Sequence, residues 1–273
     1  MTVGGAIADL AALGDVPPGS HVCWIVGDQQ QYVREATRAL EQARTTNEKP
    51  VVFGPEGSAA LAALAPYAAL AADPLTATLR GGPLDPEAMF AMFDVQSAVA
   101  RSEGYRGLRL VADMDWLLPV APTTDELVAF ELLLDRHMQR FEATIVCAYR
   151  EGSWDTAALG GTRCVHPVNV GSDAPAQFRL VAGDAGAWRL LGEVDIAVVA
   201  DFRSALTAAV DTGVCVLDAS AVSFVDLAGM RHIADAARSP DVTVRIVGAP
   251  AIVRRGWTAA GFAAAAPTVE LAG

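Results

Sequence analysis

Histidine and cysteine side chains occur in two closely spaced pairs, with a further cysteine between them. His21 and Cys23 form one pair, Cys164 and His166 the other, and Cys147 lies in a separate apolar segment. Imidazole and thiolate are ligands of zinc or iron, so these residues are candidates for a metal or redox site. Within a strand, this spacing keeps both side chains on one face. It is not an established metal-binding spacing, and we favour buried cysteines and a hydrogen-bonded histidine, with no metal or cofactor.

A second group of polar and aromatic residues follows the ends of predicted strands. Ligands of α/β sheets usually bind beyond the carboxyl ends of parallel strands, and aromatic rings with a few polar groups suit a small, partly apolar molecule. The same residues could instead only form turns and cover the end of the sheet. The residues that we expect at this edge are Gly27, Asp28, Asp113, Asp115, Trp116, Tyr149 and Arg150.

A chain that hydrolyses a nucleotide is expected to carry a phosphate-binding loop in the segment after its first strand. A phosphate-binding loop needs two glycines followed by a lysine and a hydroxyl residue, so that backbone N–H groups and the lysine hold the phosphates. Residues 26–33 read VGDQQQYV, with neither a second glycine nor a lysine. Asp28 would also repel phosphate. The sequence contains no nucleophile elbow either, so these features argue against an enzyme.

Strands and helices alternate along the first part of the chain. This alternation indicates an α/β fold with a mostly parallel sheet and helices on both faces. A strand, a helix from Gln29 and a second strand predict a parallel pair with a right-handed crossover. The expected strands are 21–26, 50–53, 108–116, 144–149 and 162–170. The expected helices are 58–70 and three segments that begin near 29, 87 and 124. Residues 1–20 should form a loose lead-in.

A small, polar, proline-bearing segment, 171–175, is the predicted linker between two domains. The first domain covers 1–170, with a core of about 17–170, and the second covers 176–273. The second should be a smaller α/β domain. Its predicted elements are a hairpin of 178–181 and 188–191, a helix over 202–210, a buried strand over 214–217, a helix from 227, a strand over 242–247 and a helix over 250–260.

The composition excludes several classes of protein. The formal net charge is −12 without a basic cluster, which disfavours a nucleic-acid partner because phosphate neutralisation needs concentrated Lys and Arg. The four cysteines do not form a disulfide framework, and the N-terminus lacks a secretory signal. No apolar run is long enough to cross a membrane. We therefore expect a cytoplasmic protein with reduced thiols and no membrane partner.

One stretch of the second domain, Val214 to His232, has a pattern of apolar strand, aspartate, small-residue turn and capped helix. With residues 192–195, which read GEVD, it resembles the STAS family of anti-sigma-factor antagonists over about 176–262. The resemblance implies a protein partner on the loop and helix, released when the serine after the helix-capping aspartate is phosphorylated. Leu227 stands in place of that serine and cannot carry phosphate. The expected partner-binding residues are Ser223, Asp226, Leu227, Ala228, Gly229, Met230 and Arg231.

Several short motifs follow one another in the first domain. They are HVC at 21–23, LRLVADMDW at 108–116, Glu131, CAY at 147–149 and HP at 166–167. In this order they resemble the MEDS family, a sensory domain named from methanogen and methylotroph proteins, over about 17–170. The resemblance implies a sensor with a fold distantly similar to the RecA/KaiC type of ATPase core.

Together these features predict a non-enzymatic signalling protein in which a sensory domain controls a STAS domain that binds a protein partner, such as an anti-sigma factor. Because Leu227 replaces the phosphoacceptor, control should pass through the first domain, where a small-molecule ligand is the candidate signal, or through protein abundance. Three alternatives stay open. They are a degenerate nucleotide-binding, ATPase-like enzyme, a metal or redox sensor that uses the Cys and His residues, and a scaffold whose domains bind only each other.

Overall fold

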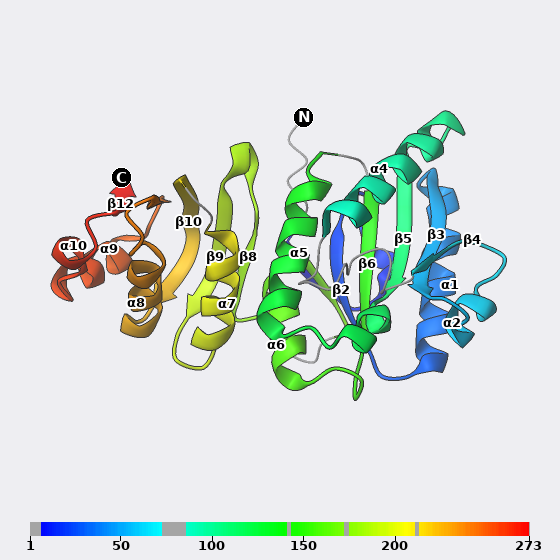
Figure 1. Cartoon of the computed structure of the whole chain (residues 1–273), viewed down its shortest axis with the longest axis horizontal. Coiled ribbons are helices and arrows are strands. Elements are labelled where there is room, and N and C mark those ends of the chain that lie inside the picture. The colour runs from blue at the N-terminus through cyan, green and yellow to red at the C-terminus, as the bar shows by residue number, and fades with distance from the viewer. Residues whose placement is uncertain (1–6, 73–85, 141–142, 172–174, 211–212, 273) are drawn as a thin grey trace.

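Two β-sheets with their helices lie side by side along the molecule in this computed structural model (Figure 1). The structure describes residues 7–72, 86–140, 143–171, 175–210 and 213–272. Residues 172–174 of the predicted linker lie outside the described residues.

The first sheet has seven strands, all parallel, in the order β1-β7-β2-β6-β5-β3-β4. The predicted α/β fold is confirmed, but β2 and β3 are not neighbours, because β6 and β5 lie between them. The strands are β1 (Ala8–Leu10), β2 (His21–Val26), β3 (Glu48–Pro55), β4 (Ala68–Ala72), β5 (Gly107–Asp113), β6 (Ala143–Arg150) and β7 (Val168–Val170).

Alternate residues of β2 enter two cores, because successive side chains of a strand point to opposite faces. Val22 and Trp24 pack on the face covered by α1 and α2, and Cys23 and Ile25 on the face covered by α4 and α5. Helices on both faces therefore bury the sheet, as parallel sheets require. The helices are α1 (Gln29–Thr45), α2 (Ala59–Ala63), α4 (Pro86–Ser102), α5 (Thr124–Met138) and α6 (Thr156–Cys164), with 3-10 turns η1 (Leu13–Asp15) and η2 (Met114–Val120).

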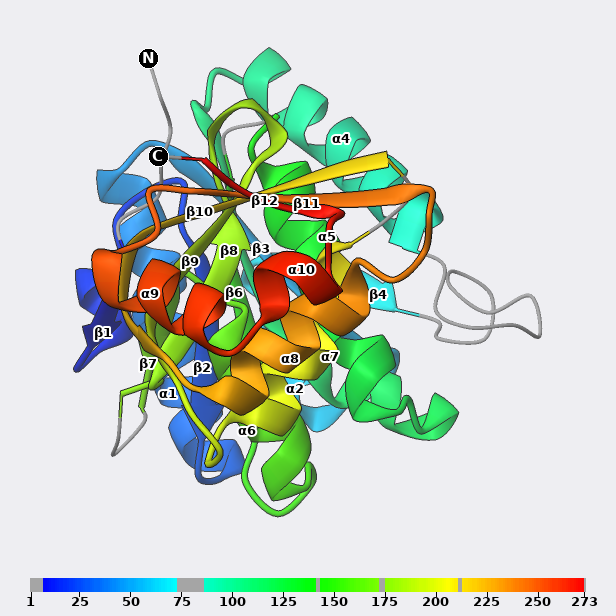
Figure 2. The ribbon, with the colours of Figure 1, turned by 90° about the vertical axis from the view of Figure 1, so that its left-hand side faces the viewer.

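The second sheet has five strands in the order β12-β11-β10-β9-β8. The predicted hairpin is confirmed as the antiparallel pair of β8 and β9, and the other neighbours are parallel. Helices α8, α9 and α10 lie together on one side of this sheet (Figure 2). The elements are β8 (Phe178–Ala182), η3 (Asp184–Gly186), β9 (Trp188–Val194), α7 (Val199–Ala209), β10 (Gly213–Val225), α8 (Leu227–Ala236), β11 (Val242–Val247), α9 (Ala251–Ala259), α10 (Phe262–Ala265) and β12 (Val269–Ala272).

The two halves of the molecule share a hydrophobic core where α5 and α6 pack against α7 and β8. Val128 and Leu132 of α5 lie in the same buried cluster as Phe178 of β8 and Phe202 of α7. In addition, the guanidinium of Arg136 lies 4.0 Å from the centre of a ring of the Trp188 indole. Helix α5 therefore packs against the first sheet and against the second domain at once (Figure 1).

Several predicted elements differ from the structure. The strand expected over 108–116 ends at Asp113, and η2 follows it. The helix expected over 58–70 ends at Ala63, and β4 follows it and pairs with β3, because strand pairing outweighs the helix preference of alanine. The strand expected over 162–170 is the end of α6 followed by the short β7. The lead-in contains β1, which pairs with β7 at the edge of the sheet.

Candidate functional site

Four buried polar side chains of the first domain meet beneath α5. They are His21, Glu131, Cys147 and His166, and one ligand atom from each lies within 4.8 Å of all the others. Glu131 Oε2 lies 3.2 Å from His21 Nε2 and 3.3 Å from His166 Nε2. Cys147 Sγ lies 3.6 Å from both His21 Nε2 and Glu131 Oε2. We call these four residues the His-Glu-Cys cluster; their side chains are all of types that bind metal ions.

The strand order of the first sheet brings these residues together. β2 lies between β6 and β7, with Cys23 directly opposite Cys147. His21 is on the same face as Cys23, and His166 lies two residues before β7, the strand on the other side of β2. Glu131 reaches the cluster from α5 above. Of the five Cys and His candidates, Cys23 therefore lies beside the cluster, with its Sγ 3.9 Å from Thr162 Oγ1, and Cys164 lies in the core between the domains.

Further partners fix the orientation of the cluster. His21 Nδ1 lies 3.3 Å from Asp135 Oδ1, and His166 Nδ1 lies 2.7 Å from the carbonyl oxygen of Thr162. The Tyr149 hydroxyl donates to Glu131. Each histidine ring is held by the contact of its Nδ1 with an acceptor outside the cluster. The opposite ring nitrogen, Nε2, therefore points into the cluster.

The pKa values in the cluster follow from burial and from these contacts. Burial opposes a charge on His21, but hydrogen bonds and charges of Asp135 and Glu131 outweigh it and raise the pKa of His21 to about 9. Burial would raise the pKa of Glu131, yet His166 and His21 hold it well below its usual range. Burial, followed by the charge of His21, lowers the pKa of His166. Burial and the charge of Glu131 raise the pKa of the Cys147 thiol well above its usual value.

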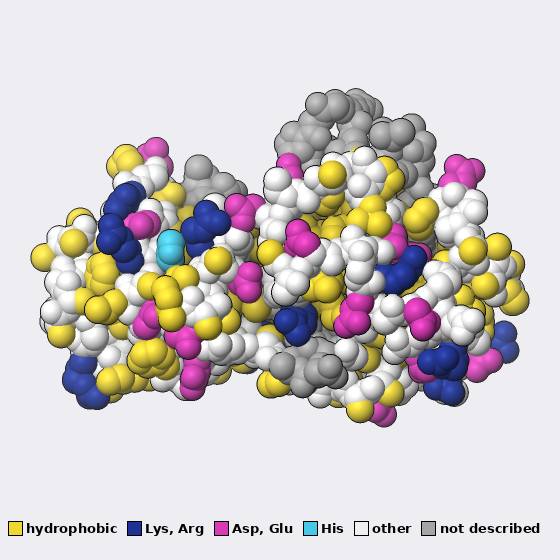
Figure 3. All heavy atoms as spheres, turned by 90° about the horizontal axis from the view of Figure 1, so that it is seen from below, with side chains coloured by type: hydrophobic (Ala, Val, Ile, Leu, Met, Phe, Trp, Pro, Cys, Tyr) yellow, Lys and Arg dark blue, Asp and Glu magenta, His cyan; other side chains and the backbone are white. Residues whose placement is uncertain are grey.

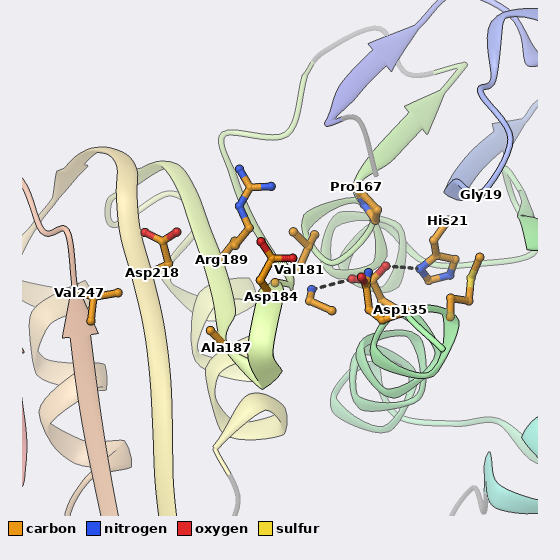
Figure 4. A pocket seen from close by; sticks show the side chains of 14 residues that line it. Gly19, His21, Asp135, Pro167, Val181, Asp184, Ala187, Arg189, Asp218 and Val247 are labelled. Carbon is orange, nitrogen blue, oxygen red and sulfur yellow. Dashed lines mark hydrogen bonds and ion pairs between the residues drawn. The ribbon is translucent and has the colours of Figure 1, made fainter. Parts of the chain in front are cut away.

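A cavity of about 260 Å³ reaches the cluster from the space between the domains. His21 and Asp135 line it from the first domain, and Ala182, Asp184 and Arg189 line it from the second (Figure 4). Asp135 bridges the two sides, because its Oδ2 accepts a hydrogen bond of 2.7 Å from the Ala182 N–H while Oδ1 faces His21. The cavity thus lies near the amino end of β2, opposite to the edge where a ligand was predicted.

At that predicted edge, Arg150 and two aspartates bond to one another, whereas Gly27 and Asp28 bond to Gln31. Arg150 pairs with Asp113 Oδ2 at 2.6 Å and with Asp115 Oδ2 at 2.9 Å. Trp116 is buried, and Tyr149 is buried and bonded to Glu131 in the cluster. Their role in ligand binding stays a prediction.

The loop after β2 caps a helix. Asp28 accepts a hydrogen bond of 2.7 Å from Gln31 N, and the Gln31 side chain accepts one of 2.9 Å from Gly27 N. Two of the backbone N–H groups that a phosphate would need are therefore already bonded to side chains.

In the second domain, the start of α8 carries an exposed leucine. Asp226 caps the helix by accepting a hydrogen bond of 2.8 Å from Gly229 N. Leu227, the next residue, exposes 63% of its surface. Met230 is buried in the core instead, and Gly229 is also buried. Of the predicted partner-binding residues, Ser223, Leu227 and Arg231 are the exposed ones, and Asp226 and Ala228 are partly exposed.

Comparison with known families agrees with both parts of the fold. The family model described as the methanogen/methylotroph, DcmR sensory domain matches residues 20–167. The chain belongs to the MEDS family. A STAS domain follows over residues 181–272, so both expected families are confirmed. No curated protein matches the chain. Both families are regulatory or sensory, and no helix among the described residues is long and apolar enough to cross a membrane.

Close packing at Gly229 predicts the effect of a methyl group in the STAS domain. An added Cβ would lie 2.8 Å from Cγ1 of both Val194 and Val225, inside the core. Gly229→Ala should therefore lower the free energy of unfolding by about 1–3 kcal/mol through overpacking. Urea unfolding measures this. Gly14→Ala is the control, because a Cβ there meets no atom within 4 Å; equal losses in both variants would contradict the packing argument.

Two residues, one in the His-Glu-Cys cluster and one beside it, had no role predicted for them at this place. Glu131 was recognised only as part of a family motif, and Asp135 was not singled out. Both lie on α5 with four-residue spacing and are buried, with exposed fractions of 0% and 2%. Two acidic residues on a buried side of a helix are the signal that could have revealed them, since buried carboxylates need partners.

Proposed function

We propose that the chain is a non-enzymatic signalling protein in which the MEDS domain senses a ligand or cellular state and the STAS domain binds a protein partner, such as an anti-sigma factor. The observation that carries this proposal is the exposure of Leu227 at the start of α8, where the resemblance places both the partner and the phosphorylated serine. A leucine there provides apolar contact but cannot receive phosphate.

Other apolar side chains lie at the same edge of the STAS sheet. Val194 and Val225 are paired at the ends of β9 and β10. Ile196 and Phe224, close to these ends in sequence, expose 74% and 43% of their surfaces. Seen from below, the STAS half of the molecule shows hydrophobic side chains beside both acidic and basic ones (Figure 3). Exposed apolar side chains at this edge favour a partner that makes a hydrophobic contact.

The domain contacts support control by the MEDS domain. Helix α5 carries part of the His-Glu-Cys cluster and packs against α7, and α7 packs against α8, which begins at Leu227. A structural change at the cluster can therefore be transmitted to α8 through the packed helices α5 and α7. Such a change alters partner binding only if the sensed ligand prefers one of two domain arrangements.

The loop after β2 supports a role without catalysis. Its N–H groups bond to Asp28 and Gln31, and it has no lysine for a phosphate. We therefore do not assign ATP hydrolysis to the MEDS domain, and measurable turnover of ATP by the purified chain would contradict this.

Leu227→Glu should weaken partner binding strongly while the protein stays folded. The new carboxylate places charge at the centre of the proposed contact, as phosphate does on a serine, and loss of a central contact weakens binding by about 30-fold or more. The full chain serves as bait in extract of its host cells, and the affinity of the retained regulator is then measured after purification.

The matched control is Val214→Glu. Val214 exposes 58% of its surface and lies at the opposite end of β10, so this variant should bind the regulator normally. Equal binding by the parent chain and the Leu227→Glu variant would exclude this edge as the contact, and retention of no regulator would count against the output role.

A further inference from the structure

Four of the six distances between ligand atoms of the His-Glu-Cys cluster match those of a tetrahedral metal site. Zinc binds nitrogen and oxygen at about 2.0–2.2 Å and sulfur at about 2.3 Å, which places neighbouring ligand atoms about 3.3–3.6 Å apart. The four separations given above, from Glu131 Oε2 to each histidine and from Cys147 Sγ to His21 and Glu131, lie between 3.2 and 3.6 Å.

One atom of the cluster lacks a hydrogen-bond partner. His166 is fully buried, and its Nε2 forms no hydrogen bond, although Glu131 Oε2 lies 3.3 Å away. A buried polar atom without a partner is costly. A metal ion among the four side chains would satisfy this nitrogen.

The surroundings also match those of metal-bound histidines. Such histidines usually donate their second ring N–H to a carboxylate or a carbonyl oxygen. Here Asp135 faces His21 Nδ1, and the Thr162 carbonyl oxygen faces His166 Nδ1. In addition, Tyr149 donates to Glu131.

We propose that His21 Nε2, Glu131 Oε2, Cys147 Sγ and His166 Nε2 bind one divalent transition-metal ion of the zinc type in the MEDS domain. Two nitrogens, a carboxylate and a thiolate suit zinc better than magnesium or calcium, which prefer oxygen ligands. The thiolate and carboxylate together neutralise the two charges of the ion, so the buried site carries no net charge. Four protein ligands complete the tetrahedron, as in structural zinc sites.

Binding exchanges protons for the ion. The Cys147 thiol gives up its proton to form the sulfur–metal bond, and His21 gives up its Nε2 proton and keeps the one on Nδ1. The ion and the two released protons both carry a charge of +2, so charge balances and no redox step occurs. The cavity that reaches His21 provides the entry path.

The site is joined to the STAS domain through Asp135. One carboxylate oxygen faces His21 and the other accepts the N–H of Ala182 in β8 (Figure 4). This step rests on the proposed function, because it makes the ion the ligand that the output domain responds to. Metal binding itself does not depend on that function.

Metal analysis of the full chain, purified without chelator, tests the site. The parent chain should contain about one zinc ion per chain, and Cys147→Ser and His166→Ala should lower this content at least tenfold. The matched control is Cys23→Ser, because Cys23 lies opposite Cys147 on the neighbouring strand and is outside the site. It should keep its zinc. Equal loss from both cysteine variants would overturn the ligand assignment.

Metal titration of the parent chain keeps the test decisive if the variants do not fold. After removal of metal by chelator, the folded chain should bind one equivalent of Co²⁺ and develop the absorption of a thiolate–cobalt bond. Folded protein that binds neither Co²⁺ nor Zn²⁺ would overturn the proposal. Neither measurement uses the protein partner, so failure here is distinct from failure of partner binding.

Asp135→Asn tests whether Asp135 positions His21 for metal binding or only stabilises the fold. It should weaken zinc binding about 10–100-fold, because an amide orients His21 less well than a carboxylate does. The variant should still bind one equivalent at saturation, with the same Co²⁺ spectrum. An unchanged zinc affinity would show that Asp135 does not position the ligand.

Discussion

The Glu131→Gln variant should lose about 3–5 kcal/mol of its free energy of unfolding. Glu131 is fully buried, accepts the Tyr149 hydroxyl and lies next to two imidazole nitrogens. Glutamine has the same shape but no charge, and its amide adds donors to a cluster that already has several. His21 then keeps only one of its two carboxylate partners. Urea unfolding in the presence of a chelator measures the loss without a contribution from bound metal.

The same substitution at the surface is the control for Glu131. Glu103 pairs with Lys49 at 2.8 Å and exposes 44% of its side chain. Glu103→Gln should cost no more than about 1 kcal/mol, because exposed ion pairs contribute little. Equal losses for the two variants would show that the buried carboxylate has no special structural role.

The Arg109→Met variant should also lose about 3–5 kcal/mol, for a reason independent of the cluster. Arg109 in β5 is fully buried and its Nη2 pairs with Glu48 Oε2 at 2.8 Å. Glu48, at the start of β3, is buried as well and also accepts the Thr144 hydroxyl at 2.6 Å. Methionine fills much of the space but leaves the Glu48 carboxylate without its cation. Urea unfolding measures the loss.

A double substitution shows whether the lost charge pair is the cause. Arg109→Met combined with Glu48→Gln removes both charges, so its loss should be smaller than the sum of the two single losses by about 0.5–3 kcal/mol. Arg38→Met is the surface control, because Arg38 exposes 63% of its side chain and pairs with Glu35 on the same helix. A double variant that shows the sum of both single losses would contradict this explanation.

Local patterns in the sequence predict much of the fold. A short apolar run identifies β2, the alternation of side chains along a strand places His21 and Cys23 on one face, and the hairpin of β8 and β9 follows from its turn. The order of strands is not contained in such patterns, because it depends on contacts between distant segments. The predicted parallel pair of β2 and β3 failed for this reason.

The cluster could be predicted only in part for the same reason. His21, Cys147 and His166 were candidates, but spacing along the sequence gave no reason to place them together. The strand order brings them into contact, and α5 adds Glu131. The expectation of no metal rested on the spacing and on how often such cysteines and histidines are simply buried, and it did not consider Glu131.

In the STAS domain, the sequence motif at the start of α8 did not decide which of two apolar side chains is exposed. Leu227 and Met230 are three residues apart, and either could face a partner or the core. The packing of α8 against the sheet turns Met230 inward and leaves Leu227 exposed. The cavity also could not be predicted, because it lies between two domains whose docking depends on α5.

Helix α5 connects these features, since it carries Glu131 and Asp135 and packs against the STAS domain through Val128 and Leu132. The central claim is that the state of the cluster sets the output of the STAS domain. Its most direct test is the affinity of the full chain for its captured regulator, measured with zinc bound and after removal of zinc. We expect the two affinities to differ at least fivefold, the lower range of allosteric coupling. Equal affinities in both states, with binding still lost in Leu227→Glu, would contradict the claim.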